Sequence, residues 1–156
     1  MIEPADFRRV LGHFATGVTV ITTLDAHGAP AGLTANAFTA VSLVPPLVLV
    51  CVDRASDTHD LIRRSGSFAV NVLASEQADV ARRFAQDERA RRFDALPWRA
   101  EVTGAPVLAD VLAWIDCRVH ATADGGDHTI YIGAVQATAA RDGDPLLFFR
   151  GAYSQP

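Results

Sequence analysis

The central stretch Gly32–Val50 is the first place where residue types and spacing could support chemistry. It begins with small and polar residues that expose backbone N–H and C=O groups, so a flat ligand could lie against the main chain. Pro45 and Pro46 force an extended backbone and remove two ladder donors, which favours a crossing between strands. An ordinary edge strand with a turn would look the same, so spacing alone leaves both interpretations open.

A phosphate site is a second possibility, where the apolar strand Leu47–Val52 runs into polar residues and a predicted helix. The first turn of a helix carries free N–H groups and a partial positive charge, which attract phosphate. The side chains that could donate to phosphate oxygens are Arg54, Ser56, Thr58 and His59. Asp57 and Asp60 argue against a dedicated anion site, and helix capping by Ser56 is the alternative.

Three residues near the end of the chain could act on a second ligand. His128 follows the glycine turn Gly125-Gly126, where a solvated histidine at a hairpin end is the alternative interpretation. Arg150 and Tyr153 come after the last predicted strand and could meet a phosphate and a flat ring. A frayed tail is the alternative for that segment.

Other kinds of catalytic site are not indicated by any motif. There is no G-x-G-x-x-G, G-x-S-x-G or H-E-x-x-H, and the five histidines are too scattered to form a triad by spacing. No cluster of cysteine and histidine has metal-ligand spacing, so we expect no metal site. All 14 basic residues are arginine, which excludes Schiff-base chemistry on lysine. If the chain is an enzyme, a cofactor therefore carries the reaction.

Composition predicts one folded domain over residues 1–156, with 49% hydrophobic and 21% charged residues. The net charge of −4 argues against nucleic-acid binding, and the arginines of Arg82–Phe84 and Arg89–Phe93 are expected to form a solvated, salt-bridged face. The first residues lack an apolar signal segment, and the longest apolar run, Ala40–Val52, is too short to cross a bilayer. We therefore expect a cytoplasmic protein without membrane segments, in which Cys51 and Cys117 are buried thiols and not a disulfide.

Apolar periodicity predicts a mainly β chain with short helices inserted. The predicted helices are Pro4–Phe14, a helix within Asp53–Ser65 capped by Ser56, and Glu76–Gln86 capped by Ser75. The predicted strands are Val18–Leu24, Pro30–Thr34, Leu47–Val52, Ser67–Leu73, Val111–Ala123, Thr129–Arg141 and Leu146–Phe149. Strands in succession favour an antiparallel barrel over a doubly wound sheet.

Taken together, the sequence resembles the flavin reductase family, the FMN-binding split barrels that serve as reductase components of two-component monooxygenases. The matching pieces follow one another along nearly the whole chain: Phe7-Arg8 with Ala15–Thr23, Gly32–Leu43 followed by Pro45–Val48, Phe68–Leu73, Arg83-Phe84, Gly126–His128 through Gly133–Val135, and Leu146–Tyr153. The resemblance implies a single flavin reductase-like domain with an antiparallel Greek-key split β-barrel fold. It also implies a homodimer that binds flavin near the subunit interface.

The resemblance further implies a role for each matching residue. Those that would line the flavin ring are Thr34, Ala35, Asn36 and Ala37, continued by Phe38 and Thr39. Those that would surround the ribityl and phosphate groups are Asp53, Arg54, Ala55, Ser56 and His59, with Arg83 and Phe84 closing the phosphate end. Those that would meet the nicotinamide cofactor are the catalytic candidate His128 together with Arg150 and Tyr153.

One position departs from the family pattern, which has serine where this chain has Ala37. The hydrogen bond that this serine would give to flavin N5 must then come from Thr34, a backbone N–H or water. The activity implied is hydride transfer from NADH or NADPH to FMN or FAD, with the reduced flavin passing to a separate oxygenase. A flavin- or haem-binding split barrel without reductase activity is the alternative, and a purely structural dimerisation domain is a third.

Overall fold

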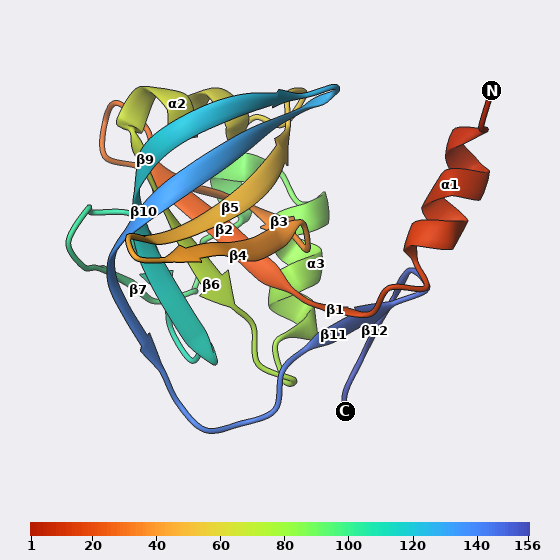
Figure 1. The fold of residues 1–156 in the computed structure, drawn as a ribbon. Coiled ribbons are helices and arrows are strands. Elements are labelled where there is room, and N and C mark those ends of the chain that lie inside the picture. Colours follow the sequence, from red (N-terminus) through yellow and green to blue (C-terminus); the bar gives the residue numbers. More distant parts are fainter.

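Antiparallel β-strands dominate the computed structural model, which describes residues 1–156 (Figure 1). The helices are α1 (Pro4–Leu11), α2 (His59–Ser65), α3 (Ala78–Gln86) and the 3₁₀ helix η1 (Arg89–Arg91). The strands are β1 (Thr16–Gly17), β2 (Thr19–Leu24), β3 (Pro30–Ala35), β4 (Phe38–Leu43), β5 (Pro46–Asp53), β6 (Ser67–Val72), β7 (Trp98–Ala100), β8 (Pro106–Leu108), β9 (Ala113–Gly125), β10 (His128–Ala140), β11 (Leu147–Phe149) and β12 (Ala152–Ser154). No helix is long and apolar enough to cross a membrane.

Seven strands form the main sheet in the order β3-β2-β6-β9-β10-β5-β4, and every neighbouring pair is antiparallel. The two edge strands, β3 and β4, are consecutive in the chain and only Asn36 and Ala37 separate them. Because three residue steps span at most about 11 Å, the sheet must coil until its edges meet. The predicted split barrel is confirmed, and its split lies at Asn36-Ala37.

Two clusters of apolar side chains form the core. The first joins the strands of the barrel through residues that include Ile21, Val50, Phe68, Val70 and Tyr131. The second fills the space between the sheet and α3, and includes Val18, Leu73, Ala81, Phe84 and Leu108. Strand β6 contributes to the first cluster, and Leu73, which directly follows β6, contributes to the second. Both cysteines are free thiols, and burial raises the pKa of Cys117 to about 12.

The predicted strands and their hairpins are confirmed, with boundaries that move by a few residues. Pro45 lies in the turn between β4 and β5, and Pro46 is the first residue of β5. The turn between β9 and β10 is Gly126-Asp127, where Gly126 adopts a φ of 75° that favours glycine. The first helix ends at Leu11, three residues before the predicted end.

Both predicted helix caps are wrong. Helix α2 begins at His59 after Thr58, because the preceding residues form tight turns in which Asp53 accepts from the Ala55 N–H and Ser56 accepts from the Thr58 N–H. Short polar side chains that bond to nearby backbone compete with helix formation in this way. Helix α3 likewise follows Gln77 and not Ser75, and the Gln77 side chain accepts from the Ala74 N–H.

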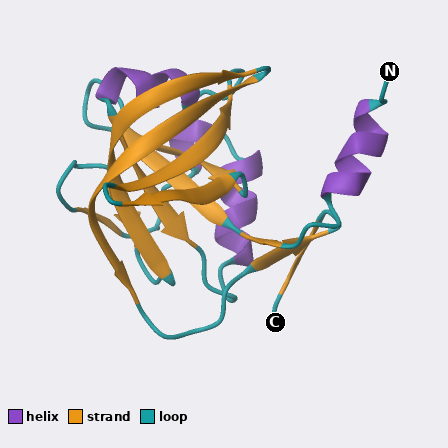
Figure 2. Cartoon of the chain, in the orientation of Figure 1, coloured by secondary structure: helices purple, strands orange, loops and turns teal.

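A small sheet of order β1-β11-β12 extends from the barrel and carries α1 away from it (Figure 2). Helix α1 has no buried residue. The turn after it is tied to the small sheet by a 2.8 Å bond from the Arg150 N–H to the Gly12 carbonyl. Residues 4–14 are called the α1 arm, and its four large apolar residues are all more than half exposed: Phe7, Val10, Leu11 and Phe14.

Candidate functional site

The split of the barrel opens onto a hollow of about 220 Å³. It is lined by Val18, Thr34, Ala35, Asn36, Ala85, Phe148 and Tyr153. Three of these come from the central stretch, and Tyr153 comes from strand β12 at the other end of the sequence. The fold thus brings the predicted ring-binding stretch and one predicted nicotinamide contact to one place. Val18, Ala85 and Phe148 were not among the predicted site residues, because an apolar residue on a strand or helix gives no sign of facing a ligand.

The small residues at the split keep backbone donors available. The N–H groups of Asn36 and Ala37 make no hydrogen bond within the chain, and both residues are exposed. The Ala37 carbonyl is already used, because it accepts from the Cys51 N–H at 3.0 Å. Free N–H groups of this kind can bind the oxygen or nitrogen edge of a flat heterocycle.

Thr34 is not a free donor to a ligand. Its hydroxyl donates to the Ala81 carbonyl of α3 at 2.6 Å. The neighbouring Ala35 carbonyl is taken as well, because the Thr19 hydroxyl donates to it at 2.6 Å. Thr34, a backbone N–H and water were the three donors expected to replace the missing serine hydroxyl at Ala37. Because the Thr34 hydroxyl is already used, a backbone N–H or water remains. Phe38 is half-buried and Thr39 exposed on β4, just beyond the split.

Two contacts hold the Tyr153 ring at the hollow, one with an aromatic ring and one with an arginine. The tyrosine ring lies 5.5 Å from that of Phe148, and the Arg82 guanidinium carbon lies 5.5 Å from the Tyr153 ring centroid. Burial raises the pKa of the Tyr153 hydroxyl above its usual value. The phenol therefore stays protonated at neutral pH and can donate a hydrogen bond.

The predicted phosphate residues divide into two groups. Arg54 and His59 line one hollow of about 360 Å³ beside the β9–β10 hairpin. Arg54 pairs there with Asp124, and His59 Nε2 lies 2.8 Å from the Thr129 hydroxyl. Asp53, Ala55 and Ser56 lie outside this hollow; Asp53 ends β5, and the other two lie in the turns that precede α2.

Arg92 joins the two parts of the candidate site and was not predicted. Its guanidinium donates to the Gly32 carbonyl at 2.9 Å and to Asp57 at 3.0 Å, and its side chain is only 12% exposed. The Arg89–Phe93 segment was predicted to be a solvated, salt-bridged face; Arg92 is salt-bridged, but the prediction that it is solvated is wrong. The only sequence signal was an arginine in a segment of many arginines, so its long-range partners could not be inferred.

Arg83 and Phe84 lie behind the central stretch. The Phe84 ring is buried, and a side chain added at Gly32 would come within 3.0 Å of it. Arg83 donates to the Asp94 carbonyl at 2.8 Å. The pair thus supports the wall formed by β3 and the loop after α3, and its contact with a ligand stays a prediction.

The three residues predicted to meet a nicotinamide cofactor lie in three places within one chain. His128 starts β10, with Nδ1 2.6 Å from Asp127 Oδ1. Arg150 lies in the turn between β11 and β12, in the other sheet, and Tyr153 faces the hollow at the split. No hydrogen bond or ion pair joins His128 to Arg150.

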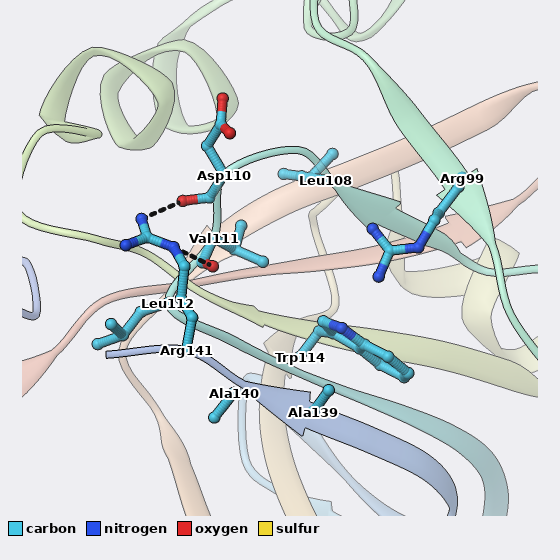
Figure 3. A pocket seen from close by; sticks show the side chains of 9 residues that line it. All are labelled: Arg99, Leu108, Asp110, Val111, Leu112, Trp114, Ala139, Ala140 and Arg141. Atoms are coloured by element: carbon cyan, nitrogen blue, oxygen red, sulfur yellow. Dashed lines mark hydrogen bonds between the residues drawn. The ribbon is translucent and has the colours of Figure 1, made fainter. Parts of the chain in front are cut away.

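A further hollow, of about 290 Å³, lies beside Trp114 and Arg141 (Figure 3). Arg141 donates to the carbonyls of Asp110 at 2.8 Å and Val111 at 3.2 Å, which closes one end. The Arg99 guanidinium carbon stands 5.5 Å from the Trp114 ring centroid. None of the predicted site residues lines this hollow.

The fold and the open split define the class of protein: a model of the flavin reductase like domain matches residues 11–156, and the chain belongs to this family. It is 45% identical to the reductase subunit HsaB of a flavin-dependent monooxygenase from Rhodococcus jostii, over 98% of this chain and 78% of that one. It is 42% identical to a flavin reductase from Pseudomonas putida, over 97% of this chain and 89% of the relative. A relative from Rhizobium meliloti, 43% identical over the whole of this chain, is longer, and the chain spans 50% of it.

Solved structures agree with this assignment. The NADH:FAD oxidoreductase of Streptomyces globisporus, solved with NAD and FAD fragments, superposes with a TM-score of 0.90 at 39% identity. The superposition covers 99% of this chain and 94% of that protein.

Proposed function

We propose that this protein is an NAD(P)H-dependent flavin reductase that transfers a hydride from NADH or NADPH to FMN or FAD. The reduced flavin then passes to a separate flavin-dependent monooxygenase. Family membership and the full-length relatives named above support the reaction. The observation in this chain that carries it is the pair of free N–H groups at Asn36 and Ala37, beside a hollow that also contains Tyr153.

The residues at the split fit a flavin ring. Bound flavin supplies the acceptor of the hydride, so the chain needs no nucleophile of its own. The N–H groups of Asn36 and Ala37 would stabilise negative charge that develops at the edge of the ring, because they are fixed before the reaction. Tyr153, protonated, would orient a ligand from the other side of the hollow. His128 is proposed to approach the nicotinamide cofactor from the β9–β10 hairpin.

The experiment that tests this function is NADH and NADPH consumption with and without added FMN, FAD or riboflavin. We expect consumption that depends on both the protein and the flavin. Absence of flavin-dependent consumption with either nucleotide would contradict the proposal. The same assay identifies the preferred flavin and the preferred nucleotide.

The flavin phosphate is assigned to Arg54 and His59. We expect Arg54→Ala to raise the dissociation constant of FMN about tenfold, because a charge-assisted hydrogen bond is lost. The dissociation constant of riboflavin, which lacks the phosphate, should not change. Flavin fluorescence titration measures both values, with Arg91→Ala as the control arginine. An equal rise in the dissociation constants of FMN and riboflavin would contradict the assignment.

The protein is proposed to be a single domain over residues 1–156 that forms a homodimer in the cytoplasm. Its two free thiols fit a reducing compartment. The apolar face of α1 supports the dimer, because an isolated helix of eight residues is marginal in water and needs a packing partner. The end of β4 and the turn after it are also apolar and open, with Leu43 89% and Val44 92% exposed.

Leu11→Asp is expected to convert the dimer into monomers, because a carboxylate cannot be buried at an apolar contact. Sedimentation velocity measures the change. Val102→Asp places the same charge at a residue that is equally exposed, 55%, but lies outside α1. It should leave the dimer intact. A wild-type protein that is monomeric, or a Leu11→Asp variant that stays dimeric, would contradict the role of α1.

A further inference from the structure

A basic hollow of about 610 Å³ lies between α1 and the turn that joins β11 to β12. It is lined by Ala5, Arg8, Arg9, Gly12, His13, Arg150 and Gly151. Three of these residues are arginines and one is a histidine, and no carboxylate lines the hollow. Positive charge is thus concentrated in one place on a chain whose net charge is −4.

Helical spacing explains how the hollow is built. Residues 5, 8, 9, 12 and 13 fall on one side of α1 and the turn that follows it, since helix neighbours recur three and four residues apart. The apolar residues Phe7, Val10, Leu11 and Phe14 fall on the opposite side. A partner that covers the apolar side would therefore leave the basic side open.

The β11–β12 turn holds Arg150 toward the helix. The Arg150 N–H donates to the Gly12 carbonyl at 2.8 Å, and the guanidinium carbon lies 5.0 Å from the Phe149 ring centroid. Arg150 has a φ of 50°, in the left-handed region that residues other than glycine rarely adopt. Glycine suits this conformation better than arginine, so the turn itself does not require the arginine side chain.

Only one of the three arginines has an anionic partner. Arg8 and Arg150 form no ion pair, and Arg9 forms one with the exposed Asp6 at 3.9 Å. Guanidinium groups bind phosphate oxygens through two parallel N–H donors, so three of them suit a ligand with more than one phosphate. A bound diphosphate would also offset the mutual repulsion of the arginines.

The same hairpin connects this hollow with the hollow at the split. Phe148 and Tyr153 pair across β11 and β12 and line the hollow at the split, while Arg150 and Gly151 form the turn at the end of the hairpin. Only Phe149 and Ala152 lie between them, so the separation is about two strand residues, or roughly 7 Å. One extended ligand can therefore reach both places. Arg54 and His59, assigned to the flavin phosphate, lie instead beside the β9–β10 hairpin.

We propose that the basic hollow binds the phosphate groups of the nicotinamide dinucleotide, while the nicotinamide end reaches the hollow at the split. The inference rests on the proposed reductase function, and it adds Arg8, Arg9 and His13 to the recognition of the hydride donor. The adenylate half of the donor is then held by the α1 arm, and the flavin phosphate is held separately.

The test combines a binding measurement with steady-state kinetics. The double variant Arg8→Ala with Arg150→Gly removes two charges, and glycine suits the φ of 50° at position 150, so folding should be kept. Binding of ADP-ribose, measured by calorimetry without flavin, should weaken at least about tenfold, and KM for NADH should rise by a similar factor. KM for FMN should change by less than about twofold. Arg91→Ala is the matched control and should change none of these values.

Two results would overturn the proposal. A rise in KM for FAD with no change in KM for NADH would assign the hollow to the diphosphate of FAD. No change in ADP-ribose binding would show that the arginines are ordinary surface charges. The binding measurement is independent of turnover, so loss of ADP-ribose affinity in a protein that never oxidises NADH would support the hollow and contradict the reductase function.

Discussion

Phe84→Ala is expected to lower the free energy of unfolding by about 3–5 kcal/mol, the usual cost of removing a buried aromatic side chain. The Phe84 ring is 1% exposed and packs edge-on against Phe93, with ring centroids 4.9 Å apart. The ring also packs against Gly32 of β3, so removing the ring leaves a cavity behind the central stretch. Urea unfolding of both proteins measures the difference.

The control for this prediction is Phe149→Ala, which removes the same side chain from a position that is 38% exposed. That variant should lower the free energy of unfolding by about 1 kcal/mol. The outcome that would contradict the core role is a Phe84→Ala protein of normal stability with a raised KM for flavin. It would instead favour the direct flavin contact that the family resemblance implies.

Asn71→Leu is expected to lower the free energy of unfolding by about 3 kcal/mol, although leucine has nearly the same size and is apolar. The Asn71 side chain is fully buried and joins three strands. Its Nδ2 donates to the Val20 carbonyl at 3.1 Å and the Pro106 carbonyl at 3.3 Å, and its Oδ1 accepts from the Leu108 N–H at 2.8 Å. The substitution leaves that N–H buried without a partner, which is costly.

Gln136→Leu is the matched control for Asn71→Leu. Gln136 is exposed, and its amide bonds only to the Ala134 carbonyl two residues away. Its replacement should change the free energy of unfolding by less than about 0.5 kcal/mol. Chemical denaturation that gives equal values for the two variants would contradict the structural role of Asn71.

The strands could be predicted from the sequence because alternation and turn residues are local signals. Ser67–Leu73 alternates apolar and small residues, and it is a strand as predicted. What the alternation could not reveal is that both faces of β6 are buried, because β8 comes from elsewhere in the chain to lie against it. The role of Asn71 as a buried link between strands follows from that covering.

The candidate site could be predicted only in part from the sequence. Thr34–Ala37 could be singled out because small and polar residues are visible locally. The bond of Thr34 to Ala81 and the bond of Arg92 to Gly32 join residues 47 and 60 positions apart, and neither has a local signature. The predicted helix starts were wrong for a different reason. Ser56 and Ser75 are both favourable capping residues, but short side-chain bonds to nearby backbone form turns there and delay the helices.

The central claim is that this chain aligns a nicotinamide dinucleotide and a flavin for direct hydride transfer. Rapid mixing of NADH with the protein and FMN in the absence of oxygen tests it most directly, by following the loss of flavin absorbance. We expect single-turnover reduction that slows when the transferred hydrogen of NADH is replaced by deuterium. Flavin that stays oxidised, or that is reduced at the rate seen without protein, would contradict it.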